Sequence, residues 1–346
     1  MKLGVPKEVE AEQRVALVPD VVNRFVKQGL TVLIEAGAGV KASHADAAYE
    51  AAGGVIVSDR SALWQDSDVM LTVGAAQQFS SDPALLEAIP SQTVVIGFMN
   101  PLAQPELAQA LAKKGVTAFS MELVPRISRA QSMDALSSQA SIGGYKAVLL
   151  AAVQLPKYFP MLTTAAGTIA PAKVLVIGAG VAGLQAIATA RRLGAVVEAF
   201  DVRPEVKEQV QSLGAQFIDV SFEEDTRGEG GYAKELSQAA QEHTQQVLTA
   251  HVQQSDVVIT TAQVPGKRAP RIVTEAMVSG MKPGSVVVDM AADQGGNCAY
   301  SEAGATVVHH GVTIMGPINL PATVAADASQ LYAKNISALL KLMVKD

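Results

Sequence analysis

The chain has 346 residues, of which 49% are hydrophobic and only 4% aromatic, so it can build two domains that each bury a sizeable core. A net charge of −6 without a basic run excludes nucleic acid as an expected partner, and the single cysteine, Cys298, excludes an internal disulfide and suits a reducing compartment. No apolar stretch is long enough to span a bilayer, and the first residues lack the apolar core of a signal peptide, so we expect a cytoplasmic chain.

The first third of the chain alternates strand and helix patterns. Apolar runs predict strands at Thr31–Glu35, Val69–Val73, Val94–Phe98 and Thr117–Ser120. Helical spacing with Pro and Gly at the ends predicts helices at Asp20–Gln28, Ala45–Ala52 and Pro105–Lys114. Many Ala, Val and Gly residues favour apolar parallel strands covered by helices. Because no glycine-rich turn follows these strands, we expect a doubly wound domain without a nucleotide of its own.

A long helical connector is expected over residues 128–157, with one soft point at Gly143-Gly144. A second run of alternating elements follows it. Its predicted strands are Lys173–Ile177, Val196–Phe200, Gln216–Ile218, Val257–Thr260, Ser285–Asp289 and Thr313–Met315. A final amphipathic helix is expected from the helical spacing of Leu331, Tyr332, Ile336, Leu339, Leu340 and Met343, and its apolar side is available to cover the first domain.

The start of the connector is unusually polar. Gln131, Asp134 and Ser137 step by three, so we expect them on one side of a helix. Two interpretations stay open. Ser128 and Gln131 have the spacing of a helix capping box, whereas the crowding of charged residues around Asp134 suits a ligand site at a cleft between domains.

A glycine turn between strand and helix gives the most specific signal in the chain. The strand Val174–Ile177 runs into GAGVAG, and a helical segment follows until Gly194. In such a turn Gly178 allows a sharp bend, Gly180 lets a pyrophosphate approach the backbone, and Gly183 lets the helix pack closely. The strand, helix, second strand and final acid together predict a dinucleotide site.

The acid at the end of the second strand indicates which dinucleotide binds. Asp201 lies 18 residues after Gly183, where a carboxylate accepts hydrogen bonds from an adenosine ribose. A carboxylate suits a free 2′-hydroxyl and repels a 2′-phosphate, which favours NAD(H) over NADP(H). Arg203 could instead pair with a phosphate, and its alternative interpretation is a solvated side chain beside Pro204.

One segment breaks the alternating pattern. Ser221–Gly231 is acidic and Gly-rich, and it precedes a long polar helix that begins near Tyr232. Its composition suits an ordinary surface loop. The functional interpretation is a lid whose glycines act as hinges and whose Tyr232 closes over the nucleotide.

Several segments in order carry a family resemblance: GVPKEVEAEQRVALVP, RISRAQSMDALSSQ, GAGVAGLQAIATARRLGA, GGYAKE, TTAQVPGK and GGNC. Together they closely resemble the NAD(H)-binding component, domain I of the alpha subunit, of proton-translocating NAD(P) transhydrogenases, in the alanine dehydrogenase/transhydrogenase family. The resemblance covers essentially the whole chain. It implies two Rossmann-like domains, predicted at 1–127 with 324–346 and at 161–323, joined by a helical connector at 128–160.

The resemblance implies roles for individual residues. Arg126, Gln131, Asp134 and Ser137 match family residues that hold and orient the nicotinamide and its ribose; the candidate catalytic residues are Arg126, Gln131 and Asp134, and Arg129 is a further cofactor-binding candidate. It implies the pyrophosphate turn at Gly178, Gly180 and Val181, the adenosine end at Asp201, Val202 and Arg203, the tip of a mobile loop at Gly231 and Tyr232, and a strand-end contact at Ala262. No metal is expected.

The resemblance also implies an assembly. NAD(H) binds to this chain, which forms a homodimer, and hydride passes to NADP(H) held on domain III of a partner beta subunit. A membrane subunit couples this transfer to proton movement, so the chain is expected at the inner face of the plasma membrane and inactive in proton pumping alone. Gln263 and Arg268 depart from the family pattern, which puts local loop contacts in doubt.

Two other functions stay open. An amino-acid dehydrogenase resembling alanine dehydrogenase needs a titratable base, but the positions of that family's lysine and histidine hold Thr72 and Asn100. Arg14, which matches that family's substrate-binding arginine, is retained. Hydride exchange between two nicotinamides needs no such base. A non-catalytic NAD-binding regulatory subunit is the third possibility.

Overall fold

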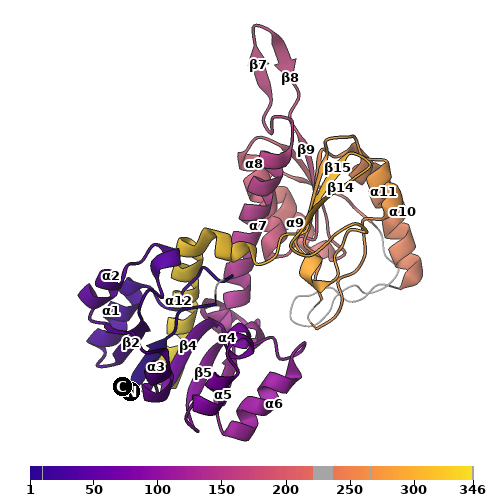
Figure 1. The fold of residues 1–346 in the computed structure, drawn as a ribbon. Coiled ribbons are helices and arrows are strands. Elements are labelled where there is room, and N and C mark those ends of the chain that lie inside the picture. The colour runs from indigo at the N-terminus through magenta and orange to yellow at the C-terminus, as the bar shows by residue number, and fades with distance from the viewer. Residues whose placement is uncertain (10, 221–236, 265, 345–346) are drawn as a thin grey trace. The chain divides into compact units, whose positions relative to one another are not determined.

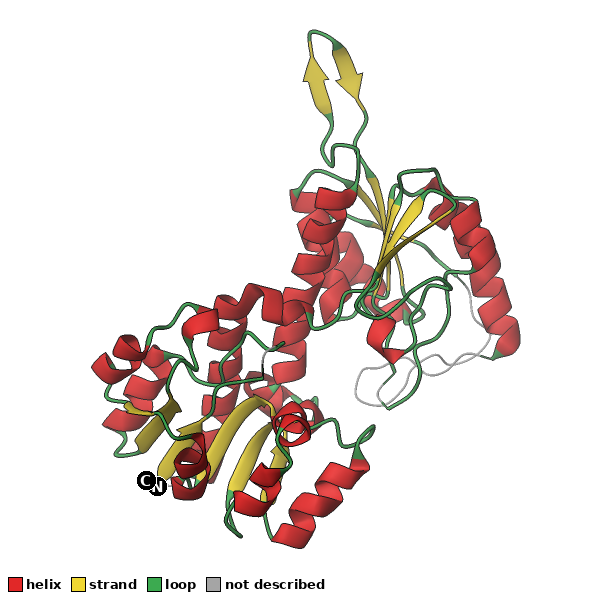
Figure 2. Cartoon of the chain, in the orientation of Figure 1, coloured by secondary structure: helices red, strands yellow, loops and turns green. Residues whose placement is uncertain are grey.

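The computed structural model describes residues 1–9, 11–220, 237–264 and 266–344. The chain divides into two compact units: Met1–Gln139 with Pro321–Asp346 form unit 1, and Ala140–Leu320 form unit 2 (Figure 1). Each unit contains one large, mainly parallel sheet between helices, which confirms the predicted doubly wound α/β class (Figure 2). The connector predicted over 128–160 includes the junction between the units, and its limits stay a prediction.

Unit 1 has a six-stranded parallel sheet in the order β3-β2-β1-β4-β5-β6. Its strands are β1 (Lys2–Val5), β2 (Thr31–Glu35), β3 (Val55–Val57), β4 (Val69–Gly74), β5 (Val94–Phe98) and β6 (Thr117–Ser120). Its helices are α1 (Pro19–Lys27), α2 (Asp46–Ala51), α3 (Arg60–Asp66), α4 (Ala75–Ser81), α5 (Ala84–Ala88) and α6 (Pro105–Lys114), with 3-10 turns at Val40–Ala42, Met121–Leu123 and Ser128–Met133. The strand order reverses at β1, which lies between β2 and β4.

Two apolar cores lie on the two faces of this sheet. Helices α3 to α6 supply one of them, which contains the chain's one tryptophan, Trp64. The other contains α1, α2 and the final helix α12 (Ala325–Met343), which follows a 3-10 turn at Leu320–Val324. In that core Tyr332 is fully buried, its ring lies 5.4 Å from that of Phe98, and its hydroxyl donates to the Thr72 carbonyl oxygen at 2.7 Å. The last helix therefore completes the core of the N-terminal unit.

Unit 2 has a seven-stranded sheet in the order β11-β10-β9-β12-β13-β15-β14, parallel except for the edge strand β14. The strands are β9 (Lys173–Ile177), β10 (Val196–Phe200), β11 (Gln216–Phe217), β12 (Val257–Thr260), β13 (Val286–Asp289), β14 (Thr306–His309) and β15 (Val312–Met315). The helices are α7 (Ala135–Gln154), whose first residues belong to unit 1, α8 (Val181–Arg192), α9 (Lys207–Ser212), α10 (Gln238–Gln254) and α11 (Glu275–Ser279), with 3-10 turns at Pro204–Val206 and Ala292–Gln294. Helices α7 to α9 cover one face, and α10 and α11 cover the other.

Helix α7 is continuous through Gly143 and Gly144, and the soft point expected at these glycines stays a prediction. Gly144 serves close packing. A Cβ atom at this position would lie 2.0 Å from the carbonyl oxygen of Ala182, in the first turn of α8. Because only glycine lets the two backbones approach this closely, α7 fixes the start of α8, where the glycine turn ends.

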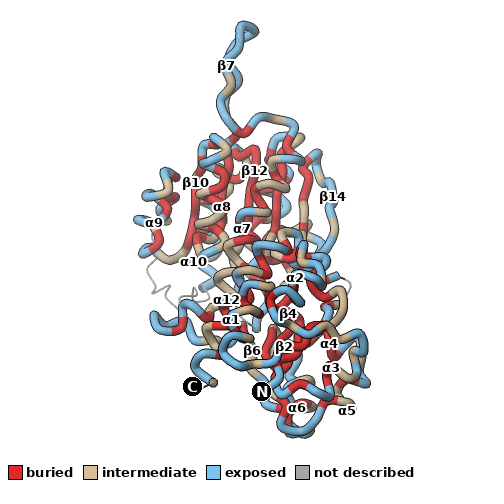
Figure 3. The backbone as a smooth tube through the Cα atoms, turned by 90° about the vertical axis from the view of Figure 1, so that its left-hand side faces the viewer, coloured by how far each residue is buried: buried red, intermediate tan, exposed pale blue. Residues whose placement is uncertain are grey.

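A two-stranded hairpin, β7 (Leu162–Thr164) and β8 (Gly167–Ile169), projects from the rest of unit 2 (Figure 1). The sequence patterns did not predict it. The central strands of both large sheets are buried, whereas the edge strand β14 and the hairpin are largely exposed (Figure 3).

Candidate functional site

The glycine turn of unit 2 leaves the carboxyl end of β9, between the ends of β10 and β12. The Gly178 N–H donates to the Phe200 carbonyl oxygen at 2.8 Å, and the Thr261 hydroxyl donates to the Gly178 carbonyl oxygen at 3.0 Å. Both neighbouring strands therefore hold the turn. The helix that follows, α8, begins at Val181 directly after Gly180, so its first N–H groups lie at the same edge of the sheet, and Val181 is 40% exposed.

The three glycines of the turn are needed for different reasons. Gly178 has φ +97°, a left-handed conformation that other residues rarely adopt. A Cβ atom at Gly183 would lie 1.8 Å from the Gly178 carbonyl oxygen. Gly180 has an ordinary extended backbone, with φ −74° and ψ −168°, and the nearest described atom to an added Cβ is Arg203 Nη2, at 4.0 Å. Within the described chain, folding requires glycine at 178 and 183 but not at 180.

The carboxylate that ends β10 is buried and closely bonded. Asp201 is 8% exposed, and its Oδ2 accepts the Ala179 N–H of the glycine turn at 2.7 Å. The same oxygen accepts Arg203 Nη2 at 2.9 Å, while Oδ1 accepts the backbone N–H and Nε of Arg203, both at 2.9 Å. These hydrogen bonds raise the pKa of the Arg203 guanidinium. The interpretation of Arg203 as a solvated side chain is therefore wrong.

Sequence reasoning missed the residue that positions the loop after β12. The buried amide of Asn297 accepts the Ala262 N–H at 3.0 Å and donates to the Ala262 carbonyl oxygen at 2.9 Å and to that of Pro270 at 2.8 Å. Both backbone groups of the predicted contact Ala262 are thus held by one side chain. The GGNC segment contains this asparagine, but its role depends on a contact across 35 residues, which a single sequence does not reveal.

A second buried carboxylate supports the same edge. Asp289, at the end of β13, accepts the Thr260 hydroxyl at 2.9 Å and the Cys298 N–H at 2.9 Å. Cys298 itself is fully buried, and burial raises the pKa of its thiol, so it acts as a packing residue rather than a nucleophile. The unusual Gln263 donates to the Met290 carbonyl oxygen at 3.0 Å, and Arg268 lies over Gly295.

The polar start of the connector differs from its prediction in two ways. Ser128 and Gln131 belong to a 3-10 turn, and in the described part of the chain neither side chain makes the bond of a capping box. The cap of α7 is Asp134, whose Oδ1 accepts the Ser137 N–H at 2.8 Å and whose Oδ2 accepts the Ser137 hydroxyl at 2.6 Å. Gln131, Asp134 and Ser137 therefore do not share one side of a continuous helix.

The predicted site residues fall in both units. Arg126, Arg129 and Gln131 are exposed and, like the half-buried Asp134 and Ser137, belong to unit 1. Unit 2 brings together the predicted pyrophosphate and adenosine residues at the carboxyl ends of β9, β10 and β12, namely Gly178, Gly180, Val181, Asp201, Val202, Arg203 and Ala262. Gly231 and Tyr232, and the lid interpretation of Ser221–Gly231, lie outside the described residues.

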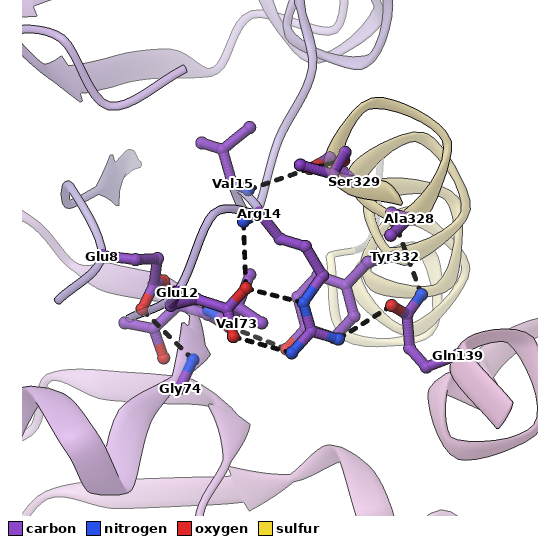
Figure 4. A network of polar contacts seen from close by, with 12 residues as sticks. Glu8, Glu12, Arg14, Val15, Val73, Gly74, Gln139, Ala328, Ser329 and Tyr332 are labelled. Atoms are coloured by element: carbon purple, nitrogen blue, oxygen red, sulfur yellow. Dashed lines mark hydrogen bonds and ion pairs between the residues drawn. The ribbon is translucent and has the colours of Figure 1, made fainter. Parts of the chain in front are cut away.

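Unit 1 contains a buried polar network that the sequence did not predict (Figure 4). Arg14, 7% exposed, donates from Nε and Nη2 to the two carboxylate oxygens of Glu12, both at 2.8 Å, and from Nη1 to Gln139 Oε1 at 2.8 Å. Gln139 in turn donates to the Ala328 carbonyl oxygen at 3.1 Å. The fork of Arg14 that could bind a substrate carboxylate therefore already holds a carboxylate of the chain.

Glu8 is the second buried acid of this network. Its carboxylate accepts the Val73 N–H at 2.6 Å, the Gly74 N–H at 3.3 Å and Gln78 Nε2 at 3.0 Å. Burial, with a smaller contribution from Glu12, raises the pKa of Glu8 to about 7. The adjoining cavity measures about 10 Å³, close to the space of one water molecule.

The positions at which alanine dehydrogenases have a lysine and a histidine hold no residue here that can act as a general base. Thr72 is fully buried in β4, and Asn100 lies in a loop with φ +49°. Among the residues that the structure describes, no three His, Cys, Asp or Glu side chains gather as a metal site would require. In the same part of the chain, no helix combines the length and apolar character needed to cross a membrane.

Comparison with known proteins gives consistent matches. Family models describe residues 4–143 as the alanine dehydrogenase/PNT N-terminal domain and residues 147–346 as its C-terminal domain. The first part of NAD(P) transhydrogenase subunit alpha of Rhodospirillum rubrum is 48% identical over 342 residues, covering 97% of this chain and 88% of the relative. The crystal structure of transhydrogenase from Sinorhizobium meliloti matches with a TM-score of 0.88 and 45% identity, over 99% of this chain and 93% of that one. Alanine dehydrogenase of Bacillus subtilis is 31% identical, over 94% of this chain and 80% of the relative.

The two doubly wound units and the glycine turn of the second define an α/β protein with a Rossmann-like nucleotide fold. The chain belongs to the alanine dehydrogenase/PNT family, which both family models show over nearly its whole length. Within that family it is a homologue of the transhydrogenase alpha subunits, so the resemblance stated from its motifs is confirmed.

Proposed function

We propose that this chain is the NAD(H)-binding subunit of a proton-translocating NAD(P) transhydrogenase. It takes part in direct hydride transfer between NADH and NADP⁺ held on domain III of a partner beta subunit. A separate membrane subunit couples that transfer to proton movement, so the chain, as a homodimer, lies at the inner face of the plasma membrane through its partners.

Gly180 carries the proposal for a nucleotide in unit 2. Its backbone conformation suits any residue, and the described neighbours leave room for a side chain. The lack of a side chain therefore serves something other than the fold. A pyrophosphate that approaches the backbone at the start of α8 provides that reason, because the N–H groups of the first helical turn favour negative charge.

The adenosine end of the proposed site is the carboxylate of Asp201. It lies at the end of the strand next to the glycine turn and is bonded to the turn through Ala179. A ribose with two free hydroxyls can donate to such a carboxylate, whereas a 2′-phosphate meets its negative charge. These two features support NAD(H) as the nucleotide of this subunit.

The bound nicotinamide supplies the hydride chemistry, and the chain's residues have to bind and orient it. We assign this orientation to Arg126, Gln131 and Asp134, with Ser137 and Arg129 beside them, and the remaining contacts to Val181, Val202, Ala262, Gly231 and Tyr232. Because hydride exchange between two nicotinamide rings moves no proton, the site needs no general base. The buried Thr72 and the neutral Asn100 agree with that requirement.

Binding by a Gly180→Ala variant tests the proposal. We expect the affinity for NADH, measured by isothermal titration calorimetry, to fall by roughly tenfold or more, because a methyl group would hold the pyrophosphate away from the backbone. The melting temperature should stay close to that of the wild type, because the added Cβ meets no described atom within 4.0 Å except Arg203 Nη2 at that distance. Unchanged NADH affinity in the folded variant would refute the assignment.

Activity assays separate the proposed function from its two alternatives. Mixed with an NADP-binding partner domain, NADPH and an oxidised NAD analogue, the chain should catalyse rapid hydride exchange. A regulatory subunit would bind NADH without exchange. An alanine dehydrogenase would oxidise NADH with pyruvate and ammonia, which we expect to be absent because Glu12 already fills the fork of Arg14.

A further inference from the structure

The carboxylate of Asp201 is fully bonded within the chain. Each oxygen accepts two hydrogen bonds: Oδ1 from the backbone N–H and Nε of Arg203, and Oδ2 from Ala179 N–H and Arg203 Nη2. A carboxylate offers about four lone-pair positions in total. A ribose can therefore bind here only if one of these donors leaves.

The side chain of Arg203 is the donor that can leave. The two backbone donors are fixed by the glycine turn and by the chain after β10. Arg203 itself precedes Pro204 and has the extended conformation, φ −92° and ψ 112°, that a following proline favours. Rotation of the side chain about its own bonds is thus enough to free one lone pair on each carboxylate oxygen.

We propose that the Arg203 guanidinium occupies the place of the adenosine ribose hydroxyls and that its displacement sets how strongly the chain distinguishes a 2′-hydroxyl from a 2′-phosphate. The inference rests on the proposed function, because it takes Asp201 as the carboxylate that meets the ribose. Arg203 is then a specificity-determining residue, in contact with the nucleotide's adenosine end.

Charge explains the direction of the effect. The pair is poorly exposed, at 15% for the Arg203 side chain and 6% for that of Asp201, so the two charges are little screened by water. While the guanidinium stays near, it neutralises the carboxylate that would repel a 2′-phosphate. In its bonded position Arg203 Nη2 lies 4.0 Å from the Cβ position of Gly180, so the positive charge stands beside the turn that would receive the nucleotide. Arg203 thus weakens both the attraction for the hydroxyls and the rejection of the phosphate.

The test is the ratio of the dissociation constants for NADPH and NADH, measured by calorimetry at one fixed ionic strength. In Arg203→Ala the guanidinium no longer competes with the ribose hydroxyls for Asp201. We therefore expect tighter NADH binding and a ratio about tenfold higher than in the wild type, which corresponds to about 1.4 kcal/mol of binding free energy. Arg203→Lys keeps the charge but not the fork, so its ratio should lie between the two. A ratio that is unchanged or lower in the alanine variant overturns the inference.

Two further variants make the test specific. Lys157→Ala removes the cation of another ion pair of unit 2, with Asp256 at 2.7 Å just before β12, and should leave the ratio unchanged. Asp201→Ala should abolish most NADH affinity. If Asp201→Ala keeps its NADH affinity, the proposed role of this carboxylate in NAD(H) binding is wrong. If Asp201→Ala loses that affinity but the Arg203 variants keep the wild-type ratio, only the inference about Arg203 is wrong. Should Arg203→Ala not fold, the lysine variant decides, because a wild-type ratio there also overturns the inference.

Discussion

Replacement of Glu8 by glutamine should change how the stability of unit 1 depends on pH. Glu8 is 6% exposed, and its carboxylate accepts from Val73 and Gly74 at the end of β4 and from Gln78 on α4. Burial raises its pKa from 4.5 to about 7. Glutamine has nearly the same shape but cannot titrate, so Glu8→Gln removes the linkage between this site and the proton concentration.

The raised pKa of Glu8 determines whether the wild-type chain becomes more or less stable as the pH rises. A folded-state pKa above the unfolded one means that the native chain binds the proton more tightly. The stabilising contribution is complete below pH 4.5 and is lost as the pH rises towards about 7. At about 1.36 kcal/mol per pH unit, this interval corresponds to roughly 3 kcal/mol of unfolding free energy for the wild type.

Urea unfolding at pH 5 and pH 8, followed by the fluorescence of Trp64, measures how the stability of unit 1 changes with pH. Trp64 is the chain's one tryptophan and is fully buried in unit 1. The variant should lose some stability at both pH values, because the new amide places a donor against Gly74 N–H and Gln78 Nε2. Its stability should nevertheless change much less between the two pH values. Glu106→Gln, an exposed substitution in α6, is the control and should keep the wild-type difference. Equal pH dependence in the wild type and Glu8→Gln would refute the raised pKa.

Three more substitutions test other features. Gly183→Ala should lower the melting temperature sharply or prevent folding, because the new Cβ would lie 1.8 Å from the Gly178 carbonyl oxygen, in contrast to Gly180→Ala; equal melting temperatures for the two variants would contradict this. Asn297→Ala should cost about 1–3 kcal/mol in urea unfolding and weaken NADH binding, because it leaves the part-buried backbone groups of Ala262 without their partner. Tyr332→Phe should cost about 1 kcal/mol in the Trp64-monitored transition, the worth of its one bond to the Thr72 carbonyl oxygen, and a loss of several times that value would indicate a wider role.

Sequence patterns predicted the long apolar strands well. β5 and β9 have the predicted bounds, because a run of β-branched residues between turn signals leaves little choice of structure. Shorter elements were missed. β3 has only three residues after Gly53-Gly54, and the β7–β8 hairpin is too short to show a period of two. The antiparallel edge strand β14 was missed as well.

The candidate site was predictable where local geometry determines it. The glycine turn and Asp201 lie on consecutive elements, so their spacing in the sequence carries the information. The fork between Arg203 and Asp201 depends on a side-chain rotamer, and the spacing gave only two open interpretations for Arg203. Glu8 and Val73 are 65 positions apart, so the burial that raises the pKa of Glu8 arises only from the folded sheet.

The core of unit 1 is made from both ends of the chain, whereas unit 2 is one uninterrupted segment. During synthesis, residues 140–320 therefore leave the ribosome with everything their sheet needs, while the first sheet must wait for Tyr332 and its neighbours on α12. Residues 1–139 are thus translated first but are the last to gain their full set of core contacts. Until then the apolar face that α12 will cover is open to aggregation or to a chaperone.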